Sequence, residues 1–298
     1  MSGPDFIPAD VRARLKALRL HGRRAAGGHG FGQHASRSRG AGLEFAQYRA
    51  YEQGDEPRQV DWKLYARSDR FFVRESERDS PLTAWVVVDA TASMAQGDAA
   101  RPRWSRLDAA RALAACVFEL ALRQGDRFGL AVIGGDGLRL VPAGSGLRQR
   151  DRCLLELQGV RAHGQWPEES KLRPLWERIG AGHLAVLLSD DFDEAAVTLA
   201  ERLSAARREV LNVQVLTAEE RDFPFRGGRR FRDAESGAEM LSDAPSARAG
   251  FIAAFAQARR ELAVRLAASG VQRTEYFLDE ALDQPLRRLF APQAADRA

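Results

Sequence analysis

From Thr83 onward the chain alternates between short apolar runs and longer segments of helical period. Apolar runs with the length and composition typical of strands predict strands at 83–89, 127–133, 184–189, 210–216 and 272–278. Apolar positions three or four residues apart predict helices at 105–124, 148–158, 171–179, 194–208, 246–269 and 282–290. Strands that alternate with helices in this way are typical of a parallel sheet with helices on both faces. Residues 83–298 are therefore expected to form a doubly wound α/β domain.

Two segments depart from this order. The apolar runs 127–133 and 138–141 are joined by Gly134-Gly135-Asp136-Gly137, a turn sequence that connects antiparallel strands. The sheet is thus expected to be mostly parallel with one antiparallel edge strand. Residues 221–244 contain a basic loop and a small hairpin that turns at Glu235-Ser236-Gly237, which we interpret as an excursion from one sheet edge.

The first 82 residues do not follow the alternation. Val11, Leu15 and Leu18 have helical spacing behind Pro8, so residues 1–25 are predicted to contain a short amphipathic helix. Residues 26–82 are expected to form an N-terminal extension that packs on the main domain. The beginning of that extension is rich in Gly, Ser and His, a composition typical of a loop.

Composition narrows the class of protein. Of the 298 residues, 45% are hydrophobic and 29% are charged, as in ordinary globular domains. Cys116 and Cys153 lie in helical patterns without CxxC spacing, which predicts reduced, buried thiols and excludes a cysteine-based zinc site. No apolar run approaches the roughly 20 residues that cross a bilayer, and the N-terminus lacks the pattern of an export signal. We therefore expect a cytoplasmic protein without a transmembrane segment.

The net charge of +4 arises in the N-terminal arm, because residues 1–40 carry +6 and the chain from residue 81 onward is neutral. The arginines of this arm, Arg23, Arg24, Arg37 and Arg39, allow an alternative function in binding nucleic acid or an anionic membrane. Only Phe6 and Phe31 could stack on bases there. Nucleic acid is therefore not the expected partner.

Oxygen-bearing side chains follow the first and fourth predicted strands of the domain. Asp89, Thr91 and Ser93 alternate after the first strand, and Asp190 follows the fourth. These two strands are neighbours in an open doubly wound sheet, and ligands bind beyond their carboxyl ends. Carboxylate and hydroxyl oxygens suit Mg²⁺ or Mn²⁺, so we predict a metal site there. The structural alternative is a loop whose hydroxyls cap backbone amides.

The segment Asp89-Ala90-Thr91-Ala92-Ser93 resembles the Asp-x-Ser-x-Ser metal motif of von Willebrand factor type A domains, with Thr91 in place of a serine. The upstream segments Glu44-Phe45, Arg49-Ala50-Tyr51, Gly54–Arg58 and Val60–Arg67 are similar to those of the bacterial family called domain of unknown function 58. The resemblance implies a von Willebrand factor type A-like fold with a partial metal-ion-dependent adhesion-type site. It also implies a role as an adaptor or chaperone component with a MoxR-type AAA+ ATPase.

The third motif of such sites aligns near Glu169-Ser170-Lys171-Leu172, where Ser170 would replace a threonine as a weak ligand and Lys171 an acid. A lysine next to a divalent ion repels it unless the side chain points away.

The charged residues around Trp62 in the upstream segment also suggest a structural role. Asp55, Arg58, Asp61 and Arg67 surround Trp62, and Asp61 is placed to cap a short helix over residues 62–68. We expect an ion-paired clamp that fastens the extension to the domain, with Trp62 buried at the junction. A direct binding role is the alternative.

No nucleophile elbow, phosphate-binding loop or metalloprotease helix is found in the sequence. The leading hypothesis is a non-enzymatic protein-interaction module without a small-molecule substrate, whose metal receives a carboxylate from a protein partner. The alternative from another class is a metal-dependent hydrolase that uses Asp89, Asp190 or Asp193.

Overall fold

The computed structural model describes residues 6–21, 45–51, 60–76, 82–233 and 237–290. The chain forms two units: residues 28–81 make the smaller one, and residues 1–27 together with 82–298 make the larger one.

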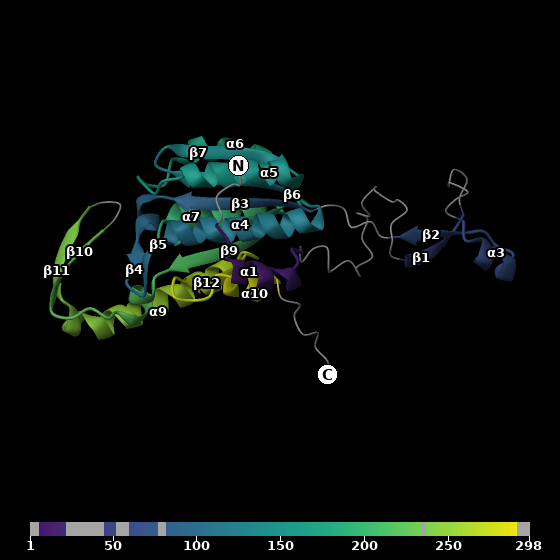
Figure 1. The fold of residues 1–298 in the computed structure, drawn as a ribbon. Helices are drawn as coiled ribbons and strands as arrows, with labels where there is room; N and C mark the ends of the chain where they lie inside the picture. Colours follow the sequence, from purple (N-terminus) through teal and green to yellow (C-terminus); the bar gives the residue numbers. More distant parts are fainter. Residues whose placement is uncertain (1–5, 22–44, 52–59, 77–81, 234–236, 291–298) are drawn as a thin grey trace. The chain divides into compact units, whose positions relative to one another are not determined.

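The larger unit is built on a six-stranded sheet of order β12-β9-β8-β3-β6-β7 (Figure 1). Its strands are β3 (Thr83–Ala90), β6 (Arg127–Gly134), β7 (Gly137–Gly144), β8 (Leu184–Ser189), β9 (Glu209–Leu216) and β12 (Gln272–Phe277). All neighbours are parallel except β6 and β7, which makes β7 an antiparallel edge strand. The predicted fold class is confirmed, and β3 and β8 are neighbours as expected.

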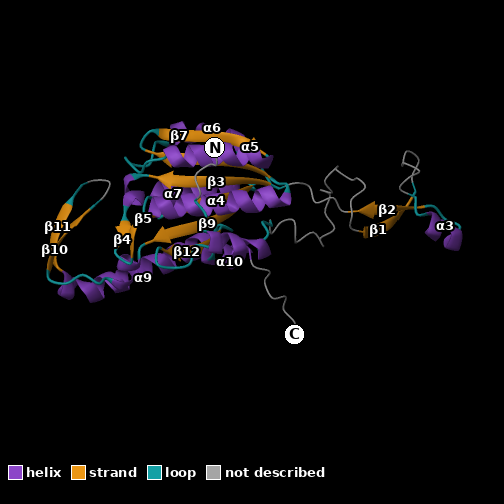
Figure 2. Ribbon diagram, viewed as in Figure 1, coloured by secondary structure: helices purple, strands orange, loops and turns teal. Residues whose placement is uncertain are grey.

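Helices cover both faces of this sheet (Figure 2). Alternate residues of β3 enter different cores, since Val86 and Val88 belong to one and Trp85 and Val87 to the other. The first core is shared with α1 (Ala9–Arg14), α4 (Arg106–Gln124), α5 (Gly146–Gly159) and α10 (Gln284–Phe290). The second is shared with α6 (Arg173–Arg178), α7 (Glu194–Ala205) and α9 (Ala244–Ala268). Among the helices that the structure describes, none combines the length and the apolar character that a bilayer crossing requires.

The long helix α4 is the centre of the first core. It begins with a capping box in which Ser105 and Asp108 each bond the other's backbone amide, and it ends at Gly125, whose φ of 74° favours glycine. The apolar stripe predicted from the sequence, Leu107, Ala110, Ala114, Val117 and Leu120, is buried. Cys116 on this helix and Cys153 on α5 are both free and buried, as predicted.

The N-terminal segment joins this core. Helix α1 and the 3₁₀ turn η1 (Leu15–Ala17) bury Val11 and Leu15 in it. The Arg14 guanidinium donates to Asp283 at 2.8 Å, and the Gln124 side chain bonds both the amide and the carbonyl of Leu20. The predicted helix is shorter than its apolar pattern, and the segment belongs to the larger unit.

The excursion predicted at 221–244 contains a hairpin of β10 (Gly228–Arg232) and β11 (Glu239–Asp243), which lies at the beginning of α9 in Figure 1. Three elements nearby were not predicted: α8 (Ala218–Asp222), β4 (Gly97–Asp98) and β5 (Arg101–Ser105). The 3₁₀ turns η3 (Ala92–Ala95) and η4 (Glu169–Leu172) complete the larger unit.

The smaller unit has an antiparallel pair, β1 (Phe45–Ala50) and β2 (Phe72–Ser76), and the helix α3 (Trp62–Ser68). Asp61 caps α3 by accepting from the amides of Lys63 and Leu64 at 3.0 Å, as predicted. Trp62 is exposed in this unit and meets Tyr65 edge-on. Arg67 is exposed on α3, whereas Asp55 and Arg58 lie outside the described residues. The clamp therefore stays a prediction.

Candidate functional site

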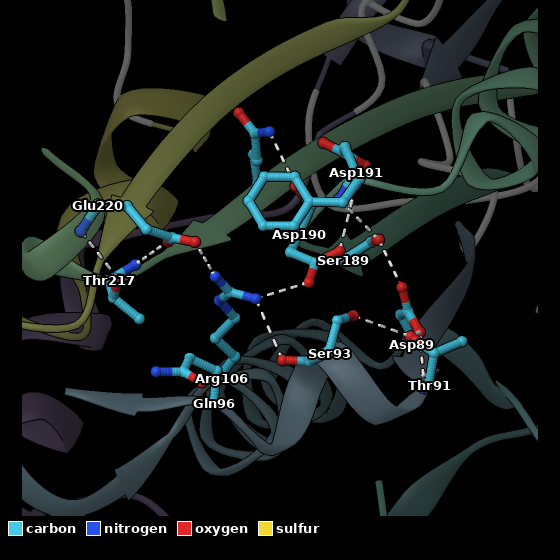
Figure 3. Close-up of polar contacts among 12 residues, drawn as sticks. Asp89, Thr91, Ser93, Gln96, Arg106, Ser189, Asp190, Asp191, Thr217 and Glu220 are labelled. Atoms are coloured by element: carbon cyan, nitrogen blue, oxygen red, sulfur yellow. Dashed lines mark hydrogen bonds and ion pairs between the residues drawn. The ribbon is translucent and has the colours of Figure 1, made fainter. Parts of the chain in front are cut away.

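The carboxyl end of β3 carries a compact group of oxygens (Figure 3). Asp89 Oδ1 accepts from the Thr91 amide at 2.9 Å and from Thr91 Oγ1 at 2.8 Å. Thr91 Oγ1 lies 3.2 Å from Ser93 Oγ. All three residues are buried, because β3 is a central strand and η3 folds its loop back over the strand end. The alternation in sequence thus brings the three side chains to one place.

The neighbouring strand β8 supplies a second group. Ser189 Oγ donates to Asp89 Oδ2 at 2.6 Å, which joins the two strand ends directly. Asp190 Oδ1 accepts from the amide of Phe192, and Asp191 takes a left-handed backbone with φ of 57°. The predicted approach of the ends of β3 and β8 is therefore present in the structure.

A buried arginine closes one side of this crevice, as Figure 3 shows. Arg106, the first residue of α4, is 2% exposed. Its Nη1 donates to Asp190 Oδ2 at 2.8 Å and to the Ser93 carbonyl at 3.1 Å, and its Nη2 bonds Glu220. One guanidinium thus bonds both Asp190 and Glu220, and its single positive charge offsets one of their two negative charges.

Glu220 is held for this contact by its own helix. Thr217 and Glu220 form a capping box at the start of α8, in which the Thr217 amide donates to Glu220 Oε2 at 2.9 Å. The other oxygen of the same carboxylate accepts from Arg106. The end of β9 is in this way linked to the beginning of α4.

Negative charge remains in excess around Asp89. Burial and then the charge of Asp190 raise the pKa of Asp89 to about 7, against the hydrogen bonds from Ser189 and Thr91. Burial also raises the pKa of Asp191 to about 7, although Asn212 donates to it at 3.0 Å. A cation placed among these oxygens would relieve both the desolvation and the repulsion.

Ser170, the fifth predicted ligand, is not brought into this group. It is exposed on η4, and within the described ranges no hydrogen bond joins it to Asp89, Thr91 or Ser93. The backbone that meets the loop after β3 is instead that of Gly164, whose carbonyl accepts from the Ala92 amide at 2.8 Å.

Lys171 packs against the β6–β7 turn, where its Cδ lies 3.8 Å from the position that a Cβ on Gly137 would take.

Three residues of the site were missed by sequence reasoning: Arg106, Ser189 and Glu220. The Thr-Ala-Glu-Glu sequence at 217–220 is a recognisable capping box and could have placed Glu220 at a helix start. Asp193, a candidate for the hydrolase, caps α7 by accepting from the Ala195 amide at 2.8 Å.

The donor set fits a hard divalent cation. In the part of the chain that the structure describes, no three His, Cys, Asp or Glu side chains are grouped so that they could hold a metal by themselves. Other oxygens would then have to contribute, and Asp89, Thr91 and Ser93 offer a carboxylate and two hydroxyls in mutual contact. Asp190 is engaged by Arg106, so it would balance the charge of an ion from outside this group.

Solved structures with a similar fold include BatB from Bacteroides thetaiotaomicron, at 15% identity and a TM-score of 0.43 over 70% of this chain and 98% of that one. The SpRpn10 VWA domain is similar at 11% identity and a TM-score of 0.39, over 70% and 95% of the two chains. In both cases the similarity concerns the fold alone.

The uncharacterized protein Rv1480 of Mycobacterium tuberculosis is 31% identical over 268 residues, which cover 87% of this chain and 82% of that protein. The family model described as protein of unknown function DUF58 matches residues 47–261. The chain therefore belongs to the DUF58 family.

Proposed function

We propose that this chain is a non-enzymatic protein-interaction module of the von Willebrand factor type A kind, whose crevice between β3 and β8 recognises an acidic group of a partner protein. The observation that carries the proposal is the contact among Asp89, Thr91 and Ser93 in a buried, acid-rich place. The hydroxyls of Thr91 and Ser189 both bond Asp89, and no histidine is among the hydrogen-bond partners that the described residues give to this group.

Asp89, Thr91 and Ser93 would hold Mg²⁺ or Mn²⁺, with Asp190 and Ser189 around them. The ion would supply a positive charge and an open coordination position for a carboxylate. Asp89 is kept in position by Ser189 and by the Thr91 amide, so its oxygens need no rearrangement to serve as ligands. A carboxylate that meets a partly desolvated cation contributes more than an exposed ion pair of about 0–1 kcal/mol.

The first test is the affinity for the metal alone. Titration calorimetry of the full chain should show one weak site for Mg²⁺ or Mn²⁺ that is absent in Asp89→Ala. Asp193→Asn is the matched control, because Asp193 is a nearby acid that only caps α7 and asparagine also caps helices. No detectable heat at millimolar metal, with the protein folded, would overturn the metal site.

The partner that we propose is a MoxR-type AAA+ ATPase, as implied by the resemblance of the upstream segment. The full chain should retain such an ATPase from the same organism in Mg²⁺ and release it in chelator, and Asp89→Ala should not retain it. Retention that is indifferent to chelator and to the substitution would refute a metal-bridged contact. Hydrolysis of phosphate esters or peptides that is lost in Asp89→Ala would move the function to the hydrolase.

A further inference from the structure

A cavity of about 410 Å³ lies between residues 166–176 and helix α7. Its apolar walls include the indole rings of Trp166 and Trp176 and the buried side chains of Leu172 and Leu199. Both tryptophans are partly buried and pack against the second core, which holds them in place. The volume is within the range of about 300–1,000 Å³ that is typical of ligand sites.

The charged side chains of this cavity are mostly acidic. Three acids, Glu169, Asp193 and Glu194, line it together with one arginine, Arg202, so the lining carries a formal charge of −2. Arg202 is paired with Glu169 across the cavity, from α7 to η4. The lining therefore favours a ligand with a positive charge.

The other partners of these acids leave the excess of negative charge in place. Arg265 of α9 bonds Glu194 and also bonds Glu201, so the charges of Arg265 and Glu201, which lie outside the lining, cancel. Asp193 Oδ1 accepts from the Ala195 amide at 2.8 Å, a contact that brings no charge.

Tryptophan rings and carboxylates together select a particular kind of cation. An indole ring attracts cations more strongly than other aromatic side chains do, and a planar guanidinium also stacks on it and bonds carboxylates in pairs. Two arginines of the chain make such contacts here: Arg202 bonds Glu169, and the guanidinium carbon of Arg208, which lies outside the lining, is 5.7 Å from the ring centre of Trp176. With Arg208 counted, one negative charge still remains in excess. A guanidinium is therefore the cation that fits this cavity.

The rim of the cavity is open to a large molecule. The side chains of Glu169, Arg202 and Glu194 are each at least half exposed. A side chain that remains attached to a protein can therefore reach the carboxylates and the tryptophan rings without opening the core.

We propose that this cavity binds the guanidinium group of an arginine in an extended segment of a partner protein. The group stacks against an indole ring and donates to the carboxylates around it. The site is separate from the proposed metal contact, because none of Asp89, Thr91 and Ser93 is among the described residues that line the cavity. Binding of the arginine therefore does not require a metal ion.

The experiment is a titration of the isotope-labelled full chain in chelator, followed by NMR through the indole N–H signals of Trp166 and Trp176. The probe is the peptide acetyl-Gly-Gly-Arg-Gly-Gly-amide, whose single charge is its guanidinium. Both signals should shift and saturate. The same peptide with citrulline, which keeps the shape without the charge, should bind about tenfold more weakly. The lysine peptide should also bind more weakly, because an ammonium does not stack on a ring.

Two substitutions at one ion pair should have opposite effects. Glu169→Gln removes an acid from the lining and should weaken the arginine peptide about fivefold, whereas Arg202→Gln removes the arginine of the lining and should strengthen it about fivefold. Glu168→Gln is the matched control, since it makes the same change at the adjacent exposed glutamate outside the lining. Trp166→Leu should weaken binding about tenfold. Thermal melting shows whether each variant is folded, and tighter binding by Arg202→Gln cannot result from unfolding.

The outcomes that would overturn the site leave the metal contact untouched. No shift at millimolar peptide, equal binding of the citrulline peptide, or unchanged binding in both Glu169→Gln and Arg202→Gln would overturn the guanidinium site. Equal binding of the lysine peptide would overturn the choice of arginine. Free arginine that binds more tightly than the peptide would identify a site for the amino acid and overturn the protein partner. Self-association in sedimentation that is lost in Glu169→Gln but kept in Glu168→Gln would show that a second copy fills the cavity and would also overturn that partner.

Discussion

Arg106 lies buried between two carboxylates and also donates to the Ser93 carbonyl. An unpaired charge costs far more in a protein interior than at the surface, so each member of this group depends on the others. The guanidinium also fixes the loop after β3 through that carbonyl. One side chain thus determines both the charge and the shape of the crevice.

Replacement of this arginine should be strongly destabilising. Arg106→Leu leaves Asp190 and Glu220 without a counter-charge, and we expect the free energy of unfolding to fall by about 3–5 kcal/mol in urea denaturation. Arg173→Leu is the control, because Arg173 is 84% exposed in its pair with Glu177 and should change stability by less than about 1 kcal/mol. A cost for Arg106→Leu as small as that of the control would contradict the role given to the ion pairs.

The sequence predicted the oxygens of this site better than its arginine. Asp89, Thr91 and Ser93 were found because alternation at a strand end leaves few conformations open. Arg106 was not found because its partners lie 84 and 114 residues away in the chain, at Asp190 and Glu220. Such contacts depend on the order of the strands in the sheet and on the position of α8 after β9. Spacing along the sequence reveals neither.

At the level of elements, strands and long helices follow the apolar pattern closely. A strand buried on both faces leaves a continuous apolar run, as in β3 and β8, and a helix packed against a sheet leaves a period of 3.6 residues. The elements that were missed, β4, β5 and α8, are short and lie where the chain crosses the carboxyl edge of the sheet. Helix α1 is shorter than its pattern, because Leu15 is buried in a 3₁₀ turn rather than in the helix. Apolar spacing shows which residues are buried, not which hydrogen bonds they make.

The stabilisation that a helix cap provides can be measured at the beginning of α4. Ser105→Ala removes the hydroxyl of the capping box, and we expect a loss of about 1 kcal/mol in the free energy of unfolding. Ser145 precedes α5 in the same way but makes no side-chain cap, so Ser145→Ala should have almost no effect. Equal losses in the two variants, measured in the same urea titration, would show that the cap at α4 is not what stabilises its start.

At the scale of the whole chain, the smaller unit is an insertion into the larger one. The Leu20 amide donates to the Gln124 side chain, and the Leu82 amide donates to Asp126 at 2.8 Å. The chain therefore leaves and re-enters the larger unit at the same end of α4. Insertions are tolerated where the two ends lie close together.

The contributions of residues 1–21 and of residues 22–81 to the stability of the larger unit can therefore be tested separately. A chain that starts at Leu82 loses α1 and with it the buried Val11, Leu15 and Leu18, so we expect it to be insoluble or to melt at a markedly lower temperature. Restoring residues 1–21 through a short Gly-Ser linker should recover cooperative melting. A linked protein no better than the truncated one, in calorimetry, would show that residues 22–81 cover apolar surface of the larger unit.

The two cysteines give the first core a chemical property of its own. Cys116 and Cys153 are fully buried on α4 and α5, and burial raises the pKa of Cys153 to about 12, so neither offers a thiolate to solvent. Alkylation must wait for these helices to separate, and its rate therefore reports opening of the native protein without any denaturant. In an intact chain the thiols are protected from peroxide and glutathione. An oxidised cysteine in a cellular sample would mark a molecule that had already unfolded.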